Sequence, residues 1–277
     1  MPGTLALHGG GEFLPGDESF LRACLEAARP TAAERAVASA AAQAPGRSGG
    51  EPDHEPADDP ANDPAALRIA VVPTAAAGQR PELAARHGVD AFARVATAAG
   101  ILARPHAVMV VDPASAASAT LAGRLAGADV IHLPGGDPGL LLRILDGSAA
   151  WHAILAALAR GAVLAGASAG AMVLADWTWT PGGWRRGLGL VTGVVVVPHA
   201  ERVERGGWAG TFGARIPATA EPIGRLGLDE RTGVVGTFAA DGRRAWRVAG
   251  PGAVHWSPDA ATPRRSARAG DLVDLPG

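Results

Sequence analysis

Short apolar runs alternate with helix-type patterns through the middle of the chain. Continuous apolar runs of strand length occur at residues 67–73, near 103–111, at 129–133 and at 162–165. Between them, apolar residues recur at helical spacing near 81–99, near 114–126, and across 138–145 and 149–160. Strands that are apolar throughout, separated by helices, indicate a parallel sheet with helices on both faces.

The last third of the chain has a different pattern. Two apolar runs, at 234–240 and 243–248, flank Asp241-Gly242, a pair typical of a two-residue hairpin turn. Further short strands are predicted at 253–256 and 271–275. We therefore predict an α/β fold: a mostly parallel sheet with helices on both faces, and a small antiparallel C-terminal extension.

Near the N-terminus the pattern is interrupted. Residues 4–8 predict a strand that leads into three glycines, and residues 17–28 predict a helix. Residues 45–64 hold no large apolar side chain and are rich in Pro, Gly, Asp and Glu, a composition typical of disorder. We predict that residues 30–66 form a disordered linker inserted in a single hydrolytic domain over residues 1–277. A binding tail is the alternative function for this segment.

Composition narrows the classes of function. Cys24 is the only cysteine, which excludes an intrachain disulfide and a cysteine-based metal site. The net charge of −2 argues against a protein that binds nucleic acid or an anionic membrane surface. No apolar run approaches the roughly 20 residues of a membrane span, and no signal-peptide pattern follows Met1. A cytoplasmic location is expected.

The strongest chemical feature is the run Gly-Ala-Ser-Ala-Gly-Ala at residues 166–171, directly after an apolar strand and before a helix. A serine on such a turn projects above the sheet edge, and small neighbours let the backbone bend and a substrate approach. The N-terminus of the following helix directs N–H groups to the place where negative charge develops in acyl transfer. Ser168 is therefore the candidate nucleophile.

A nucleophilic serine needs a base and a group that orients the base. Of the eight histidines, His54 lies in the predicted linker and His87, His106 and His152 have no site chemistry beside them, whereas His199 follows a buried strand at the edge where parallel-sheet enzymes place their chemistry. Asp229 and Glu230 supply two adjacent carboxylates before another apolar strand. The turn Gly135-Gly136, also at a strand end, can direct backbone N–H groups towards a ligand.

Taken in order, these pieces resemble the serine-peptidase family that contains cyanophycinase and dipeptidase E (aspartyl dipeptidase), built on the class I glutamine-amidotransferase-like fold. The matching stretches are 5–12 (LALHGGGE), 69–74 (IAVVPT), 131–141 (IHLPGGDPGLL), 166–171 (GASAGA), 187–199 (GLGLVTGVVVVPH), 226–235 (LGLDERTGVV) and 248–255 (VAGPGAVH). They span most of the chain outside the predicted linker.

The resemblance implies roles for individual residues. Ser168 is expected as the nucleophile, His199 as the general base and Glu230 as the third member of the triad, with Asp229 as its rival. Backbone N–H groups of Gly136 and Ala169 are expected to form the oxyanion hole. The implied reaction is peptide hydrolysis through an acyl-enzyme, with no metal and no organic cofactor.

Family members favour peptides that contain aspartyl residues, so the expected partner is a small peptide bound by a cationic group. Arg202 and Arg205 follow His199 and are candidates to hold a carboxylate, and Asp137 is a further candidate for contact with substrate. The residues beside His199 depart from the pattern of cyanophycinase-like members, so cyanophycin is not the expected substrate. The sequence leaves a homodimer open.

Two other functions remain open. An α/β-hydrolase-type esterase would use Ser168, then Asp229 or Asp241, then His255, with His8 and the glycines after it as the oxyanion motif. A non-catalytic binding module would keep the fold and lose the substrate pocket. An amidotransferase-like glutaminase would need Cys where this chain has Ser168.

Overall fold

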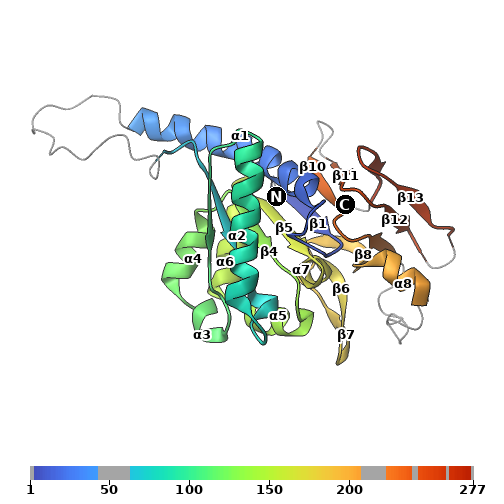
Figure 1. Cartoon of the computed structure of the whole chain (residues 1–277). Helices are drawn as coiled ribbons and strands as arrows, with labels where there is room; N and C mark the ends of the chain where they lie inside the picture. The colour runs from blue at the N-terminus through green and yellow to red at the C-terminus, as the bar shows by residue number, and fades with distance from the viewer. Residues whose placement is uncertain (1–2, 43–62, 207–222, 239–242, 260–261, 276–277) are drawn as a thin grey trace, which may run out of the picture.

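The computed structural model describes residues 3–42, 63–206, 223–238, 243–259 and 262–275. Within these ranges, helices cover both faces of a central sheet, and a second sheet lies beside it (Figure 1). This arrangement confirms the predicted α/β fold.

The central sheet has eight strands. In spatial order they are β14 (Leu272–Val273), β11 (Arg244–Ala249), β10 (Gly233–Phe238), β1 (Thr4–His8), β5 (Val163–Ala167), β4 (Val130–Leu133), β2 (Leu67–Val71) and β3 (Ala103–Ala107). The five strands that are adjacent in the order β1, β5, β4, β2 and β3 are parallel, whereas β10, β11 and β14 add an antiparallel edge. Every residue of β1, β4 and β5 is buried, as expected for strands covered on both faces.

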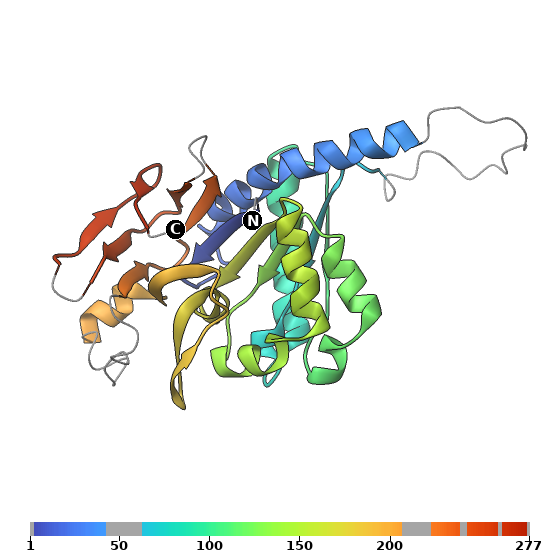
Figure 2. The same ribbon diagram turned by 180° about the vertical axis from the view of Figure 1, so that it is seen from behind.

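Two apolar cores lie on opposite faces of this sheet. On the face towards the viewer in Figure 1, α1 (Glu18–Ala42) and α2 (Pro81–Ala98) pack Phe20, Leu25 and Phe92 against the strands. The other face, seen in Figure 2, carries helices and a short 3-10 turn: η2 (Thr74–Ala76), α3 (Pro113–Ala116), α4 (Ala119–Ala126), α5 (Pro138–Leu145), α6 (Ala149–Ala159) and α7 (Ala169–Leu174).

The helix predicted near 114–126 is two helices. Asp112 caps α3, and the Ser118 hydroxyl caps α4 by accepting from the Leu121 N–H at 3.4 Å. Serine favours such a cap over a helix interior because its side chain competes for backbone N–H groups.

Among the described helices, no single one has the length and hydropathy to cross a membrane. Helices α5 and α6 together have that length and hydropathy, but the chain bends by 90° between them.

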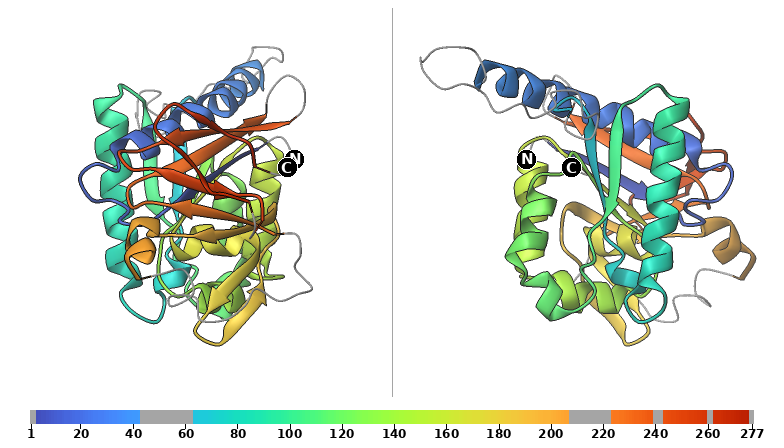
Figure 3. Two further views of the ribbon diagram at one scale, coloured as in Figure 1. Left: turned by 90° about the vertical axis from the view of Figure 1, so that its right-hand side faces the viewer. Right: turned by 60° about the vertical axis from the view of Figure 1, so that its left-hand side comes forward.

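The second sheet was not expected from the sequence. Its six strands, in spatial order, are β13 (Arg265–Ala267), β12 (Val254–Ser257), β9 (Gly224–Leu228), β8 (Val191–Val197), β6 (Ala175–Thr180) and β7 (Gly183–Arg186). It faces the viewer in the left panel of Figure 3. The apolar pattern of β8 predicts a buried strand but not its neighbours, and β8 pairs in parallel with β6 and β9, outside the central sheet.

The predicted linker starts too early. Helix α1 continues through Pro30 to Ala42, so residues 30–42 are helical. Seven of the 12 residues from 31 to 42 are alanine, the strongest helix former, and this explains how the helix continues where apolar periodicity is lost. Residues 43–62, the larger part of the predicted linker, lie outside the described residues.

The C-terminal hairpin forms as predicted. Strands β10 and β11 pair antiparallel from Gly233 opposite Ala249 to Phe238 opposite Arg244. The predicted turn residues Asp241-Gly242 lie outside the described residues.

Candidate active site

Ser168 lies between the end of β5 and the start of α7, as predicted for a strand–turn–helix nucleophile. Its φ of 47° and ψ of −111° are a conformation that side-chain-bearing residues rarely adopt. Glycine makes the bend feasible: a Cβ on Gly170 would lie 2.1 Å from the Leu133 carbonyl oxygen, and one on Gly166 would lie 2.5 Å from the Gly170 carbonyl carbon. The turn therefore holds the Ser168 side chain clear of the packed helix.

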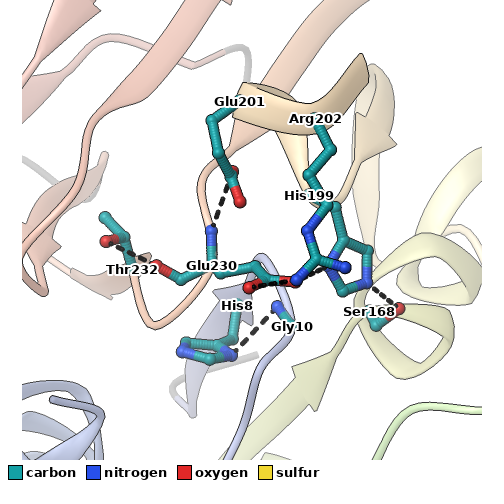
Figure 4. Close-up of polar contacts among 8 residues, drawn as sticks. All are labelled: His8, Gly10, Ser168, His199, Glu201, Arg202, Glu230 and Thr232. Atoms are coloured by element: carbon teal, nitrogen blue, oxygen red, sulfur yellow. Dashed lines mark hydrogen bonds and ion pairs between the residues drawn. The ribbon is translucent and has the colours of Figure 1, made fainter. Parts of the chain in front are cut away.

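Three side chains form a continuous polar chain at this turn (Figure 4). The Ser168 hydroxyl lies 3.1 Å from Nε2 of His199, and Nδ1 of His199 lies 2.7 Å from Oε1 of Glu230. His199 follows β8 and immediately precedes α8 (Ala200–Gly206), while Glu230 lies between β9 and β10. A carboxylate on Nδ1 favours the tautomer that leaves Nε2 free to accept the serine proton.

Asp229 does not share this contact. Its Oδ2 accepts a hydrogen bond from the Ala253 N–H at 2.9 Å, and its Oδ1 lies 3.2 Å from Nε2 of His255. The other ring nitrogen of His255 lies 2.9 Å from the Ser266 hydroxyl. The structure therefore brings Glu230, and not Asp229 or His255, into the chain that ends at Ser168.

The loop after β1 joins all the segments of this site. His8, the last residue of β1, and three residues of the loop accept hydrogen bonds from four separate N–H groups: His8 O from Ser168 at 2.9 Å, Gly9 O from His199 at 2.8 Å, Gly10 O from Arg231 at 2.8 Å, and the Glu12 carboxylate from Gly135 at 2.7 Å. The sequence assigned no role to Glu12. The signal that marks this loop is three glycines directly after a strand.

Gly10 has no room for a side chain. Its φ is +101°, and a Cβ there would lie 2.3 Å from the Cε1 atom of His199. A Cβ on Gly9 would likewise lie 2.1 Å from the Asp229 carbonyl oxygen. The glycine run therefore lets the loop pass directly beside the imidazole of His199.

A buried polar cluster lies beneath the loop. Nδ1 of His8 accepts from the Gly10 N–H at 3.2 Å, and its Nε2 lies 2.9 Å from Oδ1 of Asp17. Burial raises the pKa of Asp17, but the contact with His8 and the hydrogen bond from the Phe13 N–H outweigh it, so its pKa is lowered. Burial lowers the pKa of His132, packed between Phe13 and Phe92, to about 3.

The predicted oxyanion donors lie beside Ser168. Ala169 is the first residue of α7, so its N–H has no acceptor within the helix. Gly136 has a φ of +145°, and a Cβ there would lie 2.2 Å from the Ala75 carbonyl oxygen. Neither N–H donates a hydrogen bond to any residue that the structure describes.

Two cavities meet at this site and share Gln79, Gly136 and His199. The first, which we call the Glu12 cavity, has a volume of about 600 Å³ and is also lined by Glu12, Arg80, Leu83, His87 and Ser168. The second, the Trp179 cavity, has a volume of about 650 Å³ and is also lined by Asp137, Pro138, Met172, Trp179, Arg202 and Val203. Each is within the size range of small-ligand sites.

The predicted substrate contacts have different surroundings. Arg202 lines the Trp179 cavity, but its Nη2 also donates to Glu230. Asp137 lines the same cavity, and its Oδ1 caps α5 by accepting from the N–H groups of Gly139 and Leu140 at 2.7 and 3.0 Å. The side chain of Arg205 lies outside the described part of the chain. No group of three or more His, Cys, Asp or Glu side chains in the described ranges could hold a metal ion.

Comparison with known proteins identifies the family. The model of peptidase family S51 matches residues 49–206, more than half of the chain. The crystal structure of a peptidase from an acI-B1 Actinobacterium is 24% identical, covers 99% of this chain and 98% of its own, and has the same fold with a TM-score of 0.67. A protein of Listeria monocytogenes EGD-e, proposed as a peptidase E, is 14% identical, with 96% and 98% coverage and a TM-score of 0.44. No curated protein matches the chain. The chain belongs to peptidase family S51, the cyanophycinase and dipeptidase E family, and is a serine-type peptidase.

Proposed function

We propose that Ser168, His199 and Glu230 are the catalytic triad of a serine exopeptidase that cleaves small aspartyl or isoaspartyl peptides. The observation that supports this most strongly is the unbroken chain of contacts from the Ser168 hydroxyl through His199 to Glu230, with separations of 3.1 and 2.7 Å. Both distances are within hydrogen-bond range before any substrate is bound.

The proposed reaction runs through an acyl-enzyme. Ser168 Oγ attacks the peptide carbonyl carbon while Nε2 of His199 takes the hydroxyl proton. The same imidazole then gives that proton to the departing amine, and the C–N bond breaks. Water repeats the sequence on the ester and releases the acid, while Glu230 stabilises the imidazolium at each stage.

The oxyanion formed in each half of the reaction needs preorganised donors. The N–H groups of Gly136 and Ala169 are the proposed pair, since Ala169 directly follows Ser168, Gly136 lines the Glu12 cavity with Ser168, and neither N–H donates elsewhere among the described residues. One such donor typically contributes about 10²–10³ in kcat. No cofactor takes part in this mechanism.

Two of the proposed substrate contacts, Arg202 and Asp137, line the Trp179 cavity. Arg202 lines it and has guanidinium donors beyond the Nη2 that contacts Glu230, so it can hold a substrate carboxylate. Asp137, which borders Gly136 and lines the same cavity, is proposed as a second contact. Arg205, which follows on α8, is kept as a third.

Labelling and turnover test this function together. The purified protein is treated with a fluorophosphonate probe, and the labelled peptide is identified by mass spectrometry. Hydrolysis is then measured on Asp-X, β-Asp-X and p-nitrophenyl ester substrates, with Ser168→Ala as the control. We expect label on Ser168, hydrolysis of at least one peptide class, and no hydrolysis by the variant.

The same assays separate the alternatives. Ester hydrolysis without peptide hydrolysis would favour the esterase, and neither labelling nor turnover would favour a binding module. His199→Ala should lose about 10³-fold or more in kcat, as triad bases do. Turnover by His199→Ala close to that of the wild type would contradict the proposed triad.

A further inference from the structure

Glu12 places a carboxylate next to the nucleophile, and no described residue forms an ion pair with it. Its Oε1 accepts the Gly135 N–H at 2.7 Å, and a Cβ built on Gly135 would lie 2.9 Å from that oxygen and 3.2 Å from the Cβ of Ser168. Glu12 and Ser168 therefore lie on the same side of Gly135, and both line the Glu12 cavity.

In the part of the chain that the structure describes, no cationic side chain neutralises the Glu12 carboxylate. Among the described residues, no Arg or His nitrogen lies within 4.0 Å of it, and its one hydrogen bond comes from a neutral backbone donor. Glu12 is half-buried, so solvent screens it less than a surface carboxylate. Arg80, on the wall of the same cavity, is exposed and forms no ion pair with Glu12.

A negative charge at the position of Glu12 raises the barrier of the proposed reaction unless the substrate supplies a cation. The proposed oxyanion would form beside Gly136, the residue after the one that Glu12 holds. A second negative charge so near raises the energy of the oxyanion, whereas a cation between the two lowers it. In an α-linked N-terminal residue that acylates Ser168, the free amino group is on the carbon next to the acyl carbonyl, so it can reach a carboxylate that lines the same cavity as Ser168.

We propose that Glu12 binds the free α-ammonium group of the substrate and restricts cleavage to the bond after an N-terminal residue. The inference rests on the proposed function and makes Glu12 a specificity-determining residue of it. The charges of the two cavities complement both ends of a dipeptide. Glu12, in the cavity that Ser168 lines, complements the N-terminal ammonium group, and Arg202, in the Trp179 cavity, complements the C-terminal carboxylate. Arg80 and His87 lie in the Glu12 cavity and suit an acidic side chain on the same N-terminal residue.

The test compares Glu12→Gln with the wild type on a matched substrate pair, aspartyl p-nitroanilide and its N-acetyl derivative. Glutamine keeps an oxygen that can accept the Gly135 N–H, so the loop contact is retained and only the charge is lost. We expect the wild type to prefer the free amine by about 100-fold in kcat/KM and the variant to lose about 10- to 100-fold on that substrate alone. Glu82→Gln, an equal charge change at an exposed position on α2 outside the cavity, should behave like the wild type.

Binding supplies a readout that does not depend on turnover. Calorimetric titration of Ser168→Ala with Asp-Leu and with N-acetyl-Asp-Leu should show at least tenfold weaker binding of the blocked peptide, and the difference should vanish in the double variant with Glu12→Gln. Equal binding of the two peptides, or a wild-type preference that survives Glu12→Gln, would overturn the inference. Absence of Ser168-dependent hydrolysis would overturn the proposed function instead, and the titration would still decide the role of Glu12.

Discussion

Nη2 of Arg202 lies 2.8 Å from Oε1 of Glu230, the same carboxylate oxygen that His199 contacts at 2.7 Å. It also lies 2.9 Å from the second oxygen, Oε2. The backbone N–H of Glu230 donates to Glu201 at 3.1 Å, so neighbouring residues of α8 hold Glu230 by side chain and by backbone. The helix that follows His199 thus fixes the carboxylate that orients His199.

Arg202→Gln should therefore lower kcat by about tenfold, because Glu230 loses the partner that fixes its orientation. Arg202→Lys keeps a charge and should recover part of kcat. A role in holding a substrate carboxylate would appear separately as a rise in KM in both variants, since lysine lacks the planar pair of donors. Steady-state kinetics on the best peptide substrate measure the two effects. An unchanged kcat in Arg202→Gln would show that Glu230 needs no help from α8.

Gly10→Ala should abolish most activity without unfolding the protein. The added methyl group would lie 2.3 Å from Cε1 of His199, so the imidazole must move away from Ser168. A displacement of about 1 Å in a catalytic group can cost 10²-fold in rate. The measurements are kcat/KM and the thermal midpoint.

Gly100→Ala is the matched control for that substitution. Gly100 also has a positive φ, of +63°, but a Cβ there meets nothing within 4 Å. It should cost about 1 kcal/mol of stability from backbone strain and leave the rate unchanged. If both variants lost the same activity, the contact with His199 would not explain the result.

The site divides into a part that sequence can predict and a part that it cannot. The turn at Ser168 is local: an apolar strand, small residues and a helix start follow one another within about ten residues. The choice between Asp229 and Glu230 is not local, because it depends on which carboxylate the β9–β10 connection directs towards His199. Adjacent residues with the same chemistry give no pattern from which to choose.

The same reasoning explains the loop after β1. Its glycines predict a turn, but their function lies in contacts with segments more than 100 residues away, such as the pairing of Glu12 with Gly135. The apolar run of β8 likewise predicts burial and not its pairing with β6 and β9. The periodicity of apolar residues predicts which residues are buried, but it does not predict which strands or loops they contact in the folded chain.

Stability should fall as the pH drops below about 6.5. The pKa of His132 is lowered from 6.5 to about 3 by burial, so between these values the unfolded chain binds a proton that the folded protein excludes. In that window each pH unit should cost up to about 1.4 kcal/mol. The lowered pKa of Asp17 adds stability that is present above its ordinary 3.8 and lost as the pH falls further.

His132→Leu isolates the first of these effects. Neither ring nitrogen of His132 has a hydrogen-bond partner among the described residues, so leucine removes a buried polar group and leaves no partner unsatisfied. Urea unfolding at pH 7.5, 6 and 5 should show a flatter pH dependence for this variant than for the wild type. His152→Gln, at an exposed histidine, should leave the pH dependence as it is. An unaltered slope in His132→Leu would assign the acid sensitivity to other groups.

Glu230→Gln should lower the rate of the reaction, whereas His255→Gln should lower the stability of the fold. Loss of the Glu230 charge should lower kcat by about 10³- to 10⁴-fold, because the imidazole loses the carboxylate that sets its tautomer. His255 is buried, with its ring nitrogens directed at Asp229 and Ser266, so its replacement should cost about 1–3 kcal/mol of stability and change kcat by less than about threefold. Kinetics and urea unfolding of the two variants form the test. A large loss of kcat in His255→Gln, with Glu230→Gln fully active, would move the base to His255 and favour the esterase triad, because that triad ends at His255 and has no place for Glu230.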